Sequence, residues 1–487
     1  MIKKINRLSA VILIAATTFF GCGGTAADSL PNPPAGNKSD TAADEVTESE
    51  TEARLSLPEA DFEGKEIWFL CEAAEYSHFY DSELTGDVVD DAVYWRNSRV
   101  SENFNVKLKY DVKADSWRWS ADLKKALVAG DGKYDIVTGV CSYVIPLALN
   151  GYYLDLNQFD QLSLDQPWYA SDLNSGTEIA GKLMGVSGFF DIPSIARVHC
   201  TFYSGNLAEA FGITDLQQLV YDGKWTFDKM ISIAEQVPAD LDGDGVWGDE
   251  DRYGITSEWD ALDIDYTGTG FKFITTEADG SLTPTPYDEH VINANDMLYN
   301  LQQNSPMLYY SGYEKGHDHN IDNMVRVFAE DRALFFINGI TYTSDARIRE
   351  MGTYGLLPVP KFYEDQPEYG AFSSFFLSSI PVTAKDPDMS AVILEGLNIE
   401  SYQTVYPAYF DIALSQKFIN DDDSRNMLDI IYKHIRCDTS YIYNEHFGVD
   451  LALSIGLQKD YASWYAKNLS KFEKQLDKFE AKFAEIG

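Results

Sequence analysis

The chain has 487 residues, of which 77 are Asp or Glu and 38 are Lys or Arg, so its formal charge is -39 at pH 7. Affinity for nucleic acid comes largely from clustered Lys and Arg, so this charge excludes nucleic-acid binding as the main activity and disfavours anionic membrane surfaces. The length exceeds what one hydrophobic core supports, which predicts two or three domains, or two lobes built from interleaved segments.

The N-terminus predicts an exported, lipid-anchored protein. Basic residues precede Leu8–Phe20, an uncharged apolar run that is too short to hold a bilayer as a permanent helix. This run ends in Phe19-Phe20-Gly21-Cys22, which resembles the lipobox of bacterial lipoproteins, whose cysteine receives a diacylglycerol and becomes the new N-terminus. We expect a signal peptide over 1–21 and a lipidated Cys22. An ordinary signal peptide cut nearby, with Cys22 left as a thiol, is the alternative.

Residues 22–61 predict a flexible tether. They are rich in Gly, Ala, Ser, Thr, Pro and acidic residues, and they contain few apolar side chains to bury. Such a chain remains extended because its like charges repel each other. It would hold a globular body away from the membrane.

From Phe62 onward, short apolar runs alternate with amphipathic stretches, which is the pattern of α/β units. This order predicts a mostly parallel sheet whose ligand-facing loops follow the carboxyl ends of the strands. The expected strands are Lys65–Cys71, Val106–Val112, Tyr134–Val140 and Tyr253–Thr256, and the expected helices are Asp87–Phe104, Ser120–Ala129, Thr226–Gln236 and Tyr461–Phe483.

An acidic loop gives the sharpest local motif. The segment 240–251 fits the calcium-loop pattern D-x-D-x-D-G-x5-[DE] at every fixed position. Oxygen atoms at this spacing can surround a Ca²⁺ ion, and Gly245 allows the sharp turn. With no second loop to pair with, a structural Ca²⁺ site is expected, and a solvated acidic turn is the alternative. The predicted ligands are Asp240, Asp242, Asp244, the Val246 carbonyl and Asp251.

Sequence motifs of common enzymes do not support catalysis. Gly176–Leu183 imitates a phosphate loop but has Leu183 where the Mg²⁺-binding Ser or Thr is required. The His317-Asp318-His319 segment is expected to be a solvated loop, and neither H-E-x-x-H nor G-x-S-x-G occurs. Among so many carboxylates, one sequence selects no catalytic pair for glycoside hydrolysis.

The cysteines predict neither a redox motif nor a zinc site. They form no C-x-x-C pair and show no zinc-like spacing. A chain of this length needs no disulfide scaffold. We expect Cys71, Cys141, Cys200 and Cys437 to be mostly buried free thiols.

Several aromatic residues lie beside Gly and polar residues, where a ring can stack on a sugar rather than enter the core. Placement in the core is the alternative for each ring. Four such rings, Trp168, Phe189, Trp259 and Tyr342, belong to the predicted ligand-binding set. Tyr76 and Ser142 complete this set.

Taken in order, the segments from Phe62 to the C-terminus resemble the extracellular solute-binding proteins of ABC importers, in the group that includes maltose-binding and other sugar-binding proteins. The resemblance depends on a series of moderately specific motifs. They are 134–138 (YDIVT), 148–156 (ALNGYYLDL), 181–186 (GKLMGV), 202–207 (FYSGNL), 223–228 (GKWTFD), 328–339 (FAEDRALFFING), 354–361 (YGLLPVPK) and 378–385 (SSIPVTAK).

The resemblance implies the class II periplasmic-binding-protein-like fold, with two α/β lobes joined by crossing strands that close on a ligand in the cleft. Mapping the motifs assigns 62–164 and 333–384 to lobe one, and 165–332 and 385–487 to lobe two. It also places Trp259 in a loop at the cleft mouth, where maltose-binding relatives supply a sugar-stacking aromatic residue.

The leading hypothesis is a monomeric, lipid-anchored, non-enzymatic receptor on the extracytoplasmic face of the cell membrane. It would capture a carbohydrate, most simply an oligosaccharide, and deliver it to ABC permease subunits. A surface glycosidase and a calcium-dependent adhesion module are the alternatives. The sequence does not choose between sugars, peptides and other polar solutes as the ligand.

Overall fold

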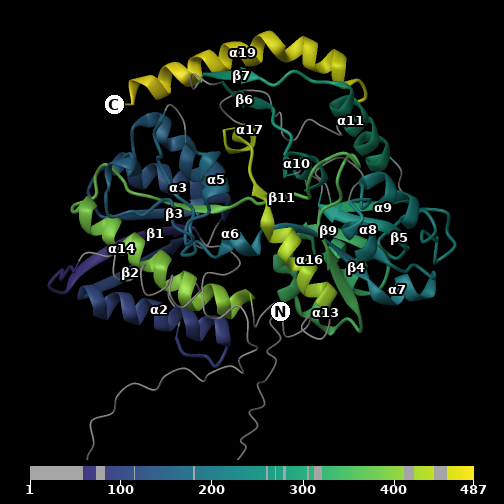
Figure 1. The fold of residues 1–487 in the computed structure, drawn as a ribbon, viewed down its shortest axis with the longest axis horizontal. Coiled ribbons are helices and arrows are strands. Elements are labelled where there is room, and N and C mark those ends of the chain that lie inside the picture. The colour runs from purple at the N-terminus through teal and green to yellow at the C-terminus, as the bar shows by residue number, and fades with distance from the viewer. Residues whose placement is uncertain are drawn as a thin grey trace, which may run out of the picture. The chain divides into compact units, whose positions relative to one another are not determined.

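The computed structural model describes residues 59–72, 83–113, 116–178, 181–258, 261–268, 270–277, 281–303, 306–311, 321–410, 422–443 and 458–486. Within these ranges the chain builds two separate sheets, each flanked by helices (Figure 1). No helix among the described residues has both the length and the apolar content to cross a membrane.

The first sheet has the strand order β12-β3-β1-β2. Strand β1 pairs in parallel with β2 and with β3, whereas β12 joins β3 in the antiparallel direction. The carboxyl ends of β1 and β3 therefore lie at one edge, beside the start of β12. The bounds are β1 Lys65–Glu72, β2 Val106–Lys113, β3 Ile136–Val140 and β12 Phe376–Ser379.

The second sheet has the order β10-β4-β9-β5-β8. Strand β5 is parallel to β8 and β9, and β4 is antiparallel to β9, so the start of β4 lies beside the end of β9. The bounds are β4 His199–Ser204, β5 Tyr253–Glu258, β8 Leu308–Ser311, β9 Ala333–Gly339 and β10 Tyr354–Leu357.

Helices cover both sheets, and two small two-stranded sheets accompany them. The longer helices are α2 Val88–Phe104, α3 Ser116–Ala129, α9 Phe227–Ala234, α10 Ala261–Gly268, α11 Glu289–Gln302, α12 Ile321–Ala329, α14 Pro387–Glu400, α16 Asp422–Lys433 and α19 Tyr461–Glu485. The short ones are α4 Cys141–Val144, η2 Ile145–Asn150, η3 Leu156–Gln158, α5 Ser171–Ser175, α6 Pro193–Ala196, α7 Gly205–Ala210, α8 Leu216–Tyr221, η4 Ile340–Ser344, α13 Ala346–Glu350, η5 Ser401–Val405 and α17 Thr439–Ile442. The small sheets pair β6 Ile274–Thr276 with β7 Leu282–Pro284, and β11 Ala371–Phe372 with β13 Ile435–Arg436.

Local sequence explains where several helices begin and end. The Asp87 carboxylate accepts hydrogen bonds from the N–H groups of Val89 and Asp90 and so caps α2, which ends at Asn105 in the left-handed conformation. In the same way, Thr226 caps α9 through the N–H of Lys229. These caps agree with the predicted starts at 87 and 226.

The strand pairing corrects the predicted lobe boundaries. We expected 333–384 in lobe one, yet β9 and β10 belong to the second sheet and only β12 returns to the first. We expected 385–487 in lobe two, yet α14 packs in the same core cluster as β1 and β3. The segment 183–190 also contributes to that cluster, although 165–332 was assigned to lobe two. A run of apolar motifs does not reveal which sheet each strand joins, because both sheets bury both faces.

Helix α19 packs against β7 and α11, and its C-terminal end lines a cavity with residues of the first lobe. Its Tyr465 hydroxyl donates to the Thr285 carbonyl at 3.0 Å, beside β7. Near its other end, Lys482 and Ile486 line a cavity of about 570 Å³ together with Gly151 of the first lobe. Figure 1 shows the helix passing above both groups of elements.

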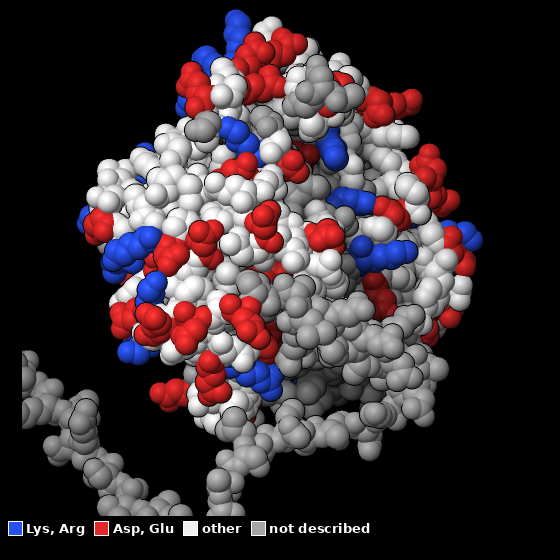
Figure 2. Space-filling view, turned by 60° about the vertical axis from the view of Figure 1, so that its left-hand side comes forward, with Lys and Arg blue, Asp and Glu red and all other residues white. Residues whose placement is uncertain are grey.

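Acidic residues dominate the surface without forming one block. On the face drawn in Figure 2, red carboxylate side chains are spread over the described surface, with blue Lys and Arg side chains among them. This distribution fits the formal charge of -39 and offers no broad basic patch on that face.

Candidate functional site

The chain crosses between the sheets at the start of β4, and Arg197 lies at this crossing. Its guanidinium lies 5.1 Å from the centre of the Phe376 ring, at the start of β12 in the first sheet. Its Cα lies beside Gly339, at the end of β9 in the second sheet. No hydrogen bond involves this guanidinium among the described residues. The half-buried Arg197 therefore presents its N–H donors where the two lobes meet.

On the first-lobe side, Glu72 ends β1 and is 2% exposed. Its Oε2 accepts a hydrogen bond from the Val140 N–H at 2.9 Å, which ties the ends of β1 and β3 together. Burial raises the pKa of Glu72 to about 7, while the Val140 N–H and the charge of Arg197 act in the opposite direction. This carboxyl can therefore be protonated or ionised near neutral pH.

Gly139 is needed beside Glu72. A Cβ at this position would lie 2.8 Å from Nε1 of Trp119 and 3.0 Å from Oε2 of Glu72. Because the glycine has no side chain, the indole and the carboxylate can approach the strand end from either side. The edge where the lobes meet, at the ends of β1 and β3, is therefore packed closely around the Glu72 carboxylate.

The second-lobe side of the edge contributes two polar pairs. His199 Nδ1 lies 2.8 Å from Oδ1 of Asp265, and both side chains are at least nine-tenths buried. The other carboxylate oxygen of Asp265 is buried without a hydrogen-bond partner among the described residues. Next to them, Asn338 Nδ2 donates to Oε2 of Glu258 at 3.4 Å, so the ends of β5 and β9 are also joined.

Behind the edge, a fully buried carboxyl holds the first sheet together. Asp191 accepts hydrogen bonds from the hydroxyls of Thr138 on β3 and Ser378 on β12. Burial raises its pKa to about 7, against these hydroxyl donors and the charge of Arg96. The Arg96 guanidinium lies 5.0 Å from the centre of the Phe190 ring. This network positions the crossing segment and is not accessible to a ligand.

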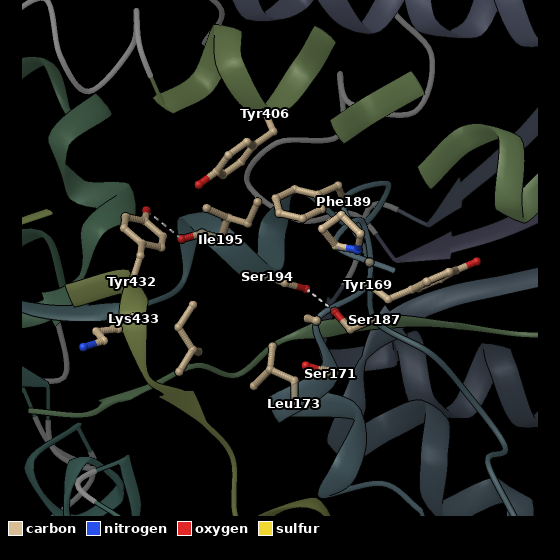
Figure 3. Close-up of a pocket in the computed structure, with 14 residues that line it drawn as sticks. Tyr169, Ser171, Leu173, Ser187, Phe189, Ser194, Ile195, Tyr406, Tyr432 and Lys433 are labelled. Atoms are coloured by element: carbon tan, nitrogen blue, oxygen red, sulfur yellow. Dashed lines mark hydrogen bonds between the residues drawn. The ribbon is translucent and has the colours of Figure 1, made fainter. Parts of the chain in front are cut away.

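A pocket of about 210 Å³ lies beside the same crossing segment (Figure 3). Ser194 and Ile195 of α6 line it, and α6 ends at Ala196, the residue before Arg197. The Tyr432 hydroxyl donates to the Ile195 carbonyl at 3.1 Å, so the end of α16 is fastened to the crossing. Lys433 adds an ammonium group to the lining.

Aromatic rings form one wall of this pocket. The Phe189 ring meets the Tyr406 ring edge-on with centroids 4.5 Å apart, and Figure 3 shows both beside α6. Tyr406 follows η5, a π-helical turn that continues α14, and such turns occur frequently at functional sites. The pocket thus combines aromatic faces with hydroxyls and one cation, which is the composition of small-molecule sites.

The acidic loop brings three of its predicted ligands together. Carboxylate oxygens of Asp240, Asp242 and Asp244 lie within 4.8 Å of one another, and all three residues are exposed. Gly243 and Gly245 adopt the left-handed conformation that allows the chain to turn around them.

Asp251 departs from the expected arrangement. It is 1% exposed, and its carboxylate accepts hydrogen bonds from the N–H groups of Leu241 and Gly248. It therefore closes the base of the loop rather than joining the three carboxylates. Val246 is 67% exposed, and its N–H donates to Asp244.

The predicted ligand-binding residues fall into different environments. Ser142 lies half-buried on α4, directly after β3, and Phe189 lines the pocket. Tyr342 packs edge-on against Phe336 after β9. Trp168 is 1% exposed, so the structure places its indole in the core. The indole Nε1–H donates to Glu395, which is the polar partner that a buried indole requires. Tyr76, Trp259 and Cys22 lie outside the described residues.

Sequence reasoning missed the carboxylates and cations at the edge. Glu72 and Asp265 lie far along the chain from Arg197 and His199, and none of the four residues matches a motif. One usable signal existed, because polar residues end the apolar strands β1 and β5 and begin β4. The carboxyl ends of such strands are where open α/β sheets bind ligands.

No protein-family model matches the sequence, and no curated protein resembles it significantly in sequence. Solved structures match it in fold. The sugar-binding protein MalE from Xanthomonas citri has a TM-score of 0.60 at 13% identity, covering 87% of this chain and 100% of that one. The galacto-N-biose/lacto-N-biose I-binding protein of the ABC transporter from Bifidobacterium longum has a TM-score of 0.55 at 14% identity, covering 88% and 98%.

A third match is the GacH receptor of Streptomyces glaucescens, described with acarbose, at a TM-score of 0.53 and 14% identity, covering 87% of this chain and 100% of that one. Identities this low establish the fold and nothing finer. The chain has the two-lobed α/β fold of these sugar-binding proteins, which confirms the predicted fold class.

Proposed function

We propose that this chain, which has the fold of ABC-transporter sugar-binding proteins, captures a carbohydrate between its lobes and delivers it to a membrane permease. The observation that carries the proposal is the edge formed by Glu72, Arg197 and the Asn338–Glu258 pair, where polar side chains from both sheets meet at one crossing. An oligosaccharide is the ligand class that we infer, since the named structural neighbours include binders of disaccharides and of acarbose.

Sugars present hydroxyl groups that both donate and accept hydrogen bonds. The half-buried Glu258 carboxylate can accept them, and the Arg197 guanidinium donates in a fixed plane. Aromatic rings such as Phe189 and Tyr406 offer surfaces for the apolar faces of a sugar ring. Because the groups come from both lobes, a ligand that touches all of them binds the closed arrangement more tightly than the open one. Closure then needs no chemical step.

We also propose that Asp240, Asp242 and Asp244 hold a structural Ca²⁺ ion with the Val246 carbonyl. The 4.8 Å grouping of the three carboxylates supports this, as does the twelve-residue spacing. Asp251 then acts as a bridge between the backbone N–H groups of Leu241 and Gly248. Bound Ca²⁺ would supply charge neutralisation to a loop that otherwise repels itself.

For the N-terminus we retain the proposal of a lipid anchor at Cys22 on the extracytoplasmic face, because 1–21 has the features of a signal peptide. Replacing Cys22 with Ala should move the protein from the membrane fraction to the soluble fraction. Retention of this variant in the membrane would contradict the anchor.

The function itself is tested with purified protein and a panel of oligosaccharides. A binding protein shows saturable heat release in calorimetry and a rise in melting temperature, with every sugar recovered intact by chromatography. Shortened sugars would indicate the glycosidase alternative. Binding restricted to polymers or proteins, and dependent on Ca²⁺, would indicate the adhesion alternative, and binding of peptides alone would overturn the carbohydrate assignment.

A further inference from the structure

The C-terminal helix α19, Tyr461–Glu485, separates its charged residues by side. Its large apolar residues share one face and are buried against the body of the protein. Because successive residues of a helix are rotated by about 100°, five lysines fall on a single stripe well away from that face. They are Lys467, Lys471, Lys474, Lys478 and Lys482, and all five are exposed.

The acidic residues of α19 lie mainly on another stripe. Glu473, Asp477 and Glu480 fall on the opposite flank of the buried face. This flank faces β7, since the Glu480 carboxylate accepts a hydrogen bond from the N–H of Leu282. Glu485, at the end of the helix, is the one carboxylate of α19 within the lysine stripe. The outer side of the helix is therefore basic in a strongly acidic protein.

This separation of charges weakens the helix itself. The lysines of the stripe are three or four residues apart, so each has another lysine as its neighbour along the helix. Like charges at these spacings destabilise a helix, whereas Glu and Lys four residues apart stabilise it. Solvation alone does not require such a stripe, because mixed charges keep a helix equally well hydrated. The stripe therefore points to a role outside the helix.

The stripe is uncovered. In Figure 1, α19 runs along the upper margin of the molecule with β7 on its inner side. The described elements that it packs against are β7 and α11. Within the described part of the chain, no hydrogen bond or ion pair involves four of the ammonium groups, those of Lys467, Lys474, Lys478 and Lys482. These cations are available to an anionic partner.

A further cation continues the stripe onto the first lobe. Lys182 and Lys482 line the same cavity of about 570 Å³. The loop that carries Lys182 is held in place because the Leu183 N–H donates to the Asp155 carboxylate at 3.0 Å. Asp155 and Glu485 also line the cavity, so its lining is mixed in charge. The purely basic part of the surface is therefore the stripe on α19.

We propose that the lysine stripe of α19 is a docking surface for an anionic lipid bilayer, with the helix lying parallel to the membrane. The five ammonium groups follow a straight helix over about 22 Å, and a flat layer of headgroups can meet all of them at once. Among the described residues, no large exposed apolar side chain belongs to α19, whereas a stable protein interface has an apolar core. Both observations favour headgroups over a protein partner.

The formal charge of -39 repels anionic lipids from the molecule as a whole, so the stripe has to act at short range. At about 0.1 M salt, exposed charges are largely screened beyond about 10 Å. Lysines in contact with headgroups therefore outweigh carboxylates on the far side of the protein. Docking would also fix the orientation of a body that a flexible tether alone leaves free to turn. The proposal goes beyond sugar capture and rests on the proposed function only for placing the protein beside a membrane.

The test is sedimentation of the whole chain with lipid vesicles at about 0.1 M salt, with Cys22→Ala present so that no lipid is attached. One set of vesicles is pure phosphatidylcholine, and the other contains equal parts of phosphatidylcholine and phosphatidylglycerol. The parent should bind the anionic vesicles more strongly, and replacing the stripe should lower the ratio of bound to free protein by about tenfold or more. The replacements are Lys467→Gln, Lys471→Gln, Lys474→Gln, Lys478→Gln and Lys482→Gln.

The matched control removes five exposed lysines from other parts of the surface and changes the net charge equally. Its replacements are Lys107→Gln, Lys124→Gln, Lys125→Gln, Lys224→Gln and Lys229→Gln. This control should bind like the parent. A variant with Arg at all five stripe positions should also bind like the parent, because the charge is kept. All variants should melt within a few degrees of the parent, since every replaced side chain is exposed.

Three results would overturn the proposal. The first is equal binding of the parent to both kinds of vesicle, and the second is an equal loss of binding in the stripe variant and the control. The third is a parent that sediments as a dimer without vesicles and becomes a monomer in the stripe variant, which would assign the stripe to a second copy of the chain. No step of this test uses a sugar, so its result is separate from that of the binding experiment.

Discussion

The acidic loop at 240–246 and the edge where the lobes meet both gather carboxylates, but they differ in what surrounds the charge. The loop carboxylates are exposed and lie within 4.8 Å of one another with backbone N–H groups as partners. At the edge, Glu72 is buried and faces Arg197. Exposed carboxylates repel one another and can be neutralised by a cation that binds from solvent. A buried charge has to be stabilised by partners within the protein.

This difference predicts that the two regions respond to different variables. The loop should respond to divalent ions and be indifferent to pH near neutrality. The edge should respond to pH and to ligand and be indifferent to chelators.

Glu72 should make stability depend on pH. Its pKa is raised from 4.5 to about 7 in the folded protein. Between pH 4.5 and about 7, the folded state therefore holds a proton that the unfolded state has lost. Stability from this group is therefore complete below pH 4.5 and falls as the pH rises to about 7, by about 3 kcal/mol in total. Glu72→Gln should remove this loss, as measured by urea unfolding from pH 4 to 8.

The control for this measurement is Glu102→Gln, a change at an exposed position of α2. It should leave the pH profile of the unfolding free energy parallel to that of the parent protein. A Glu72→Gln profile that is equally parallel would contradict the buried-carboxyl assignment.

Saturating Ca²⁺ should stabilise the protein through the loop. An ion that binds only the folded state adds about 2.7 kcal/mol at one hundred times its Kd. Asp240→Ala and Asp244→Ala should abolish this gain, which calorimetry measures as a rise in melting temperature. The Glu72→Gln protein is the matched control and should keep the full gain. A melting temperature that ignores chelator in the parent would leave only the solvated-turn interpretation.

Arg197→Ala should weaken sugar binding at least thirtyfold, or about 2 kcal/mol, because a charge-assisted hydrogen bond to ligand is lost. Titration calorimetry gives the affinity, and Arg347→Ala is the control because its guanidinium pairs with Asp345 away from the edge. Unchanged affinity in Arg197→Ala would remove this residue from the ligand site.

Trp259→Ala should weaken sugar binding at least tenfold, about 1.4 kcal/mol, while the melting temperature changes by no more than a few degrees. Trp168→Ala is its counterpart, since truncating a core Trp typically costs about 3 to 5 kcal/mol of stability. If Trp259→Ala unfolds the protein, Trp259 belongs to the core, and if it binds normally, Trp259 is outside the site.

Local patterns explain why sequence reasoning found the loop and missed the edge. A calcium loop is defined by twelve consecutive residues, and the start of helix α2 is marked by its N-cap residue, Asp87. The buried face of α2 was harder to predict, because Val88 is 43% exposed whereas Val93 and Arg96 are buried. Apolar spacing alone does not anticipate that an arginine will be buried under a phenylalanine ring.

The edge depends on which strand lies beside which, and that information is not local. Asp191 and Glu72 look like surface residues in the sequence, and only the pairing of β3 with β1 and β12 buries them. The wrong lobe assignment of β9 and β10 has the same origin. Predicting the site would have required the topology first.

Helix α19 has a mechanical consequence for any movement of the lobes. Its 25 residues form a rod of about 37 Å that is fastened near one end to Thr285 and near the other lines the cavity at Gly151. A rod of fixed length keeps the two attachment points at a fixed separation while the rest of each lobe turns. We therefore expect any rotation of the lobes to be smallest beside α19 and largest on the edge farthest from it.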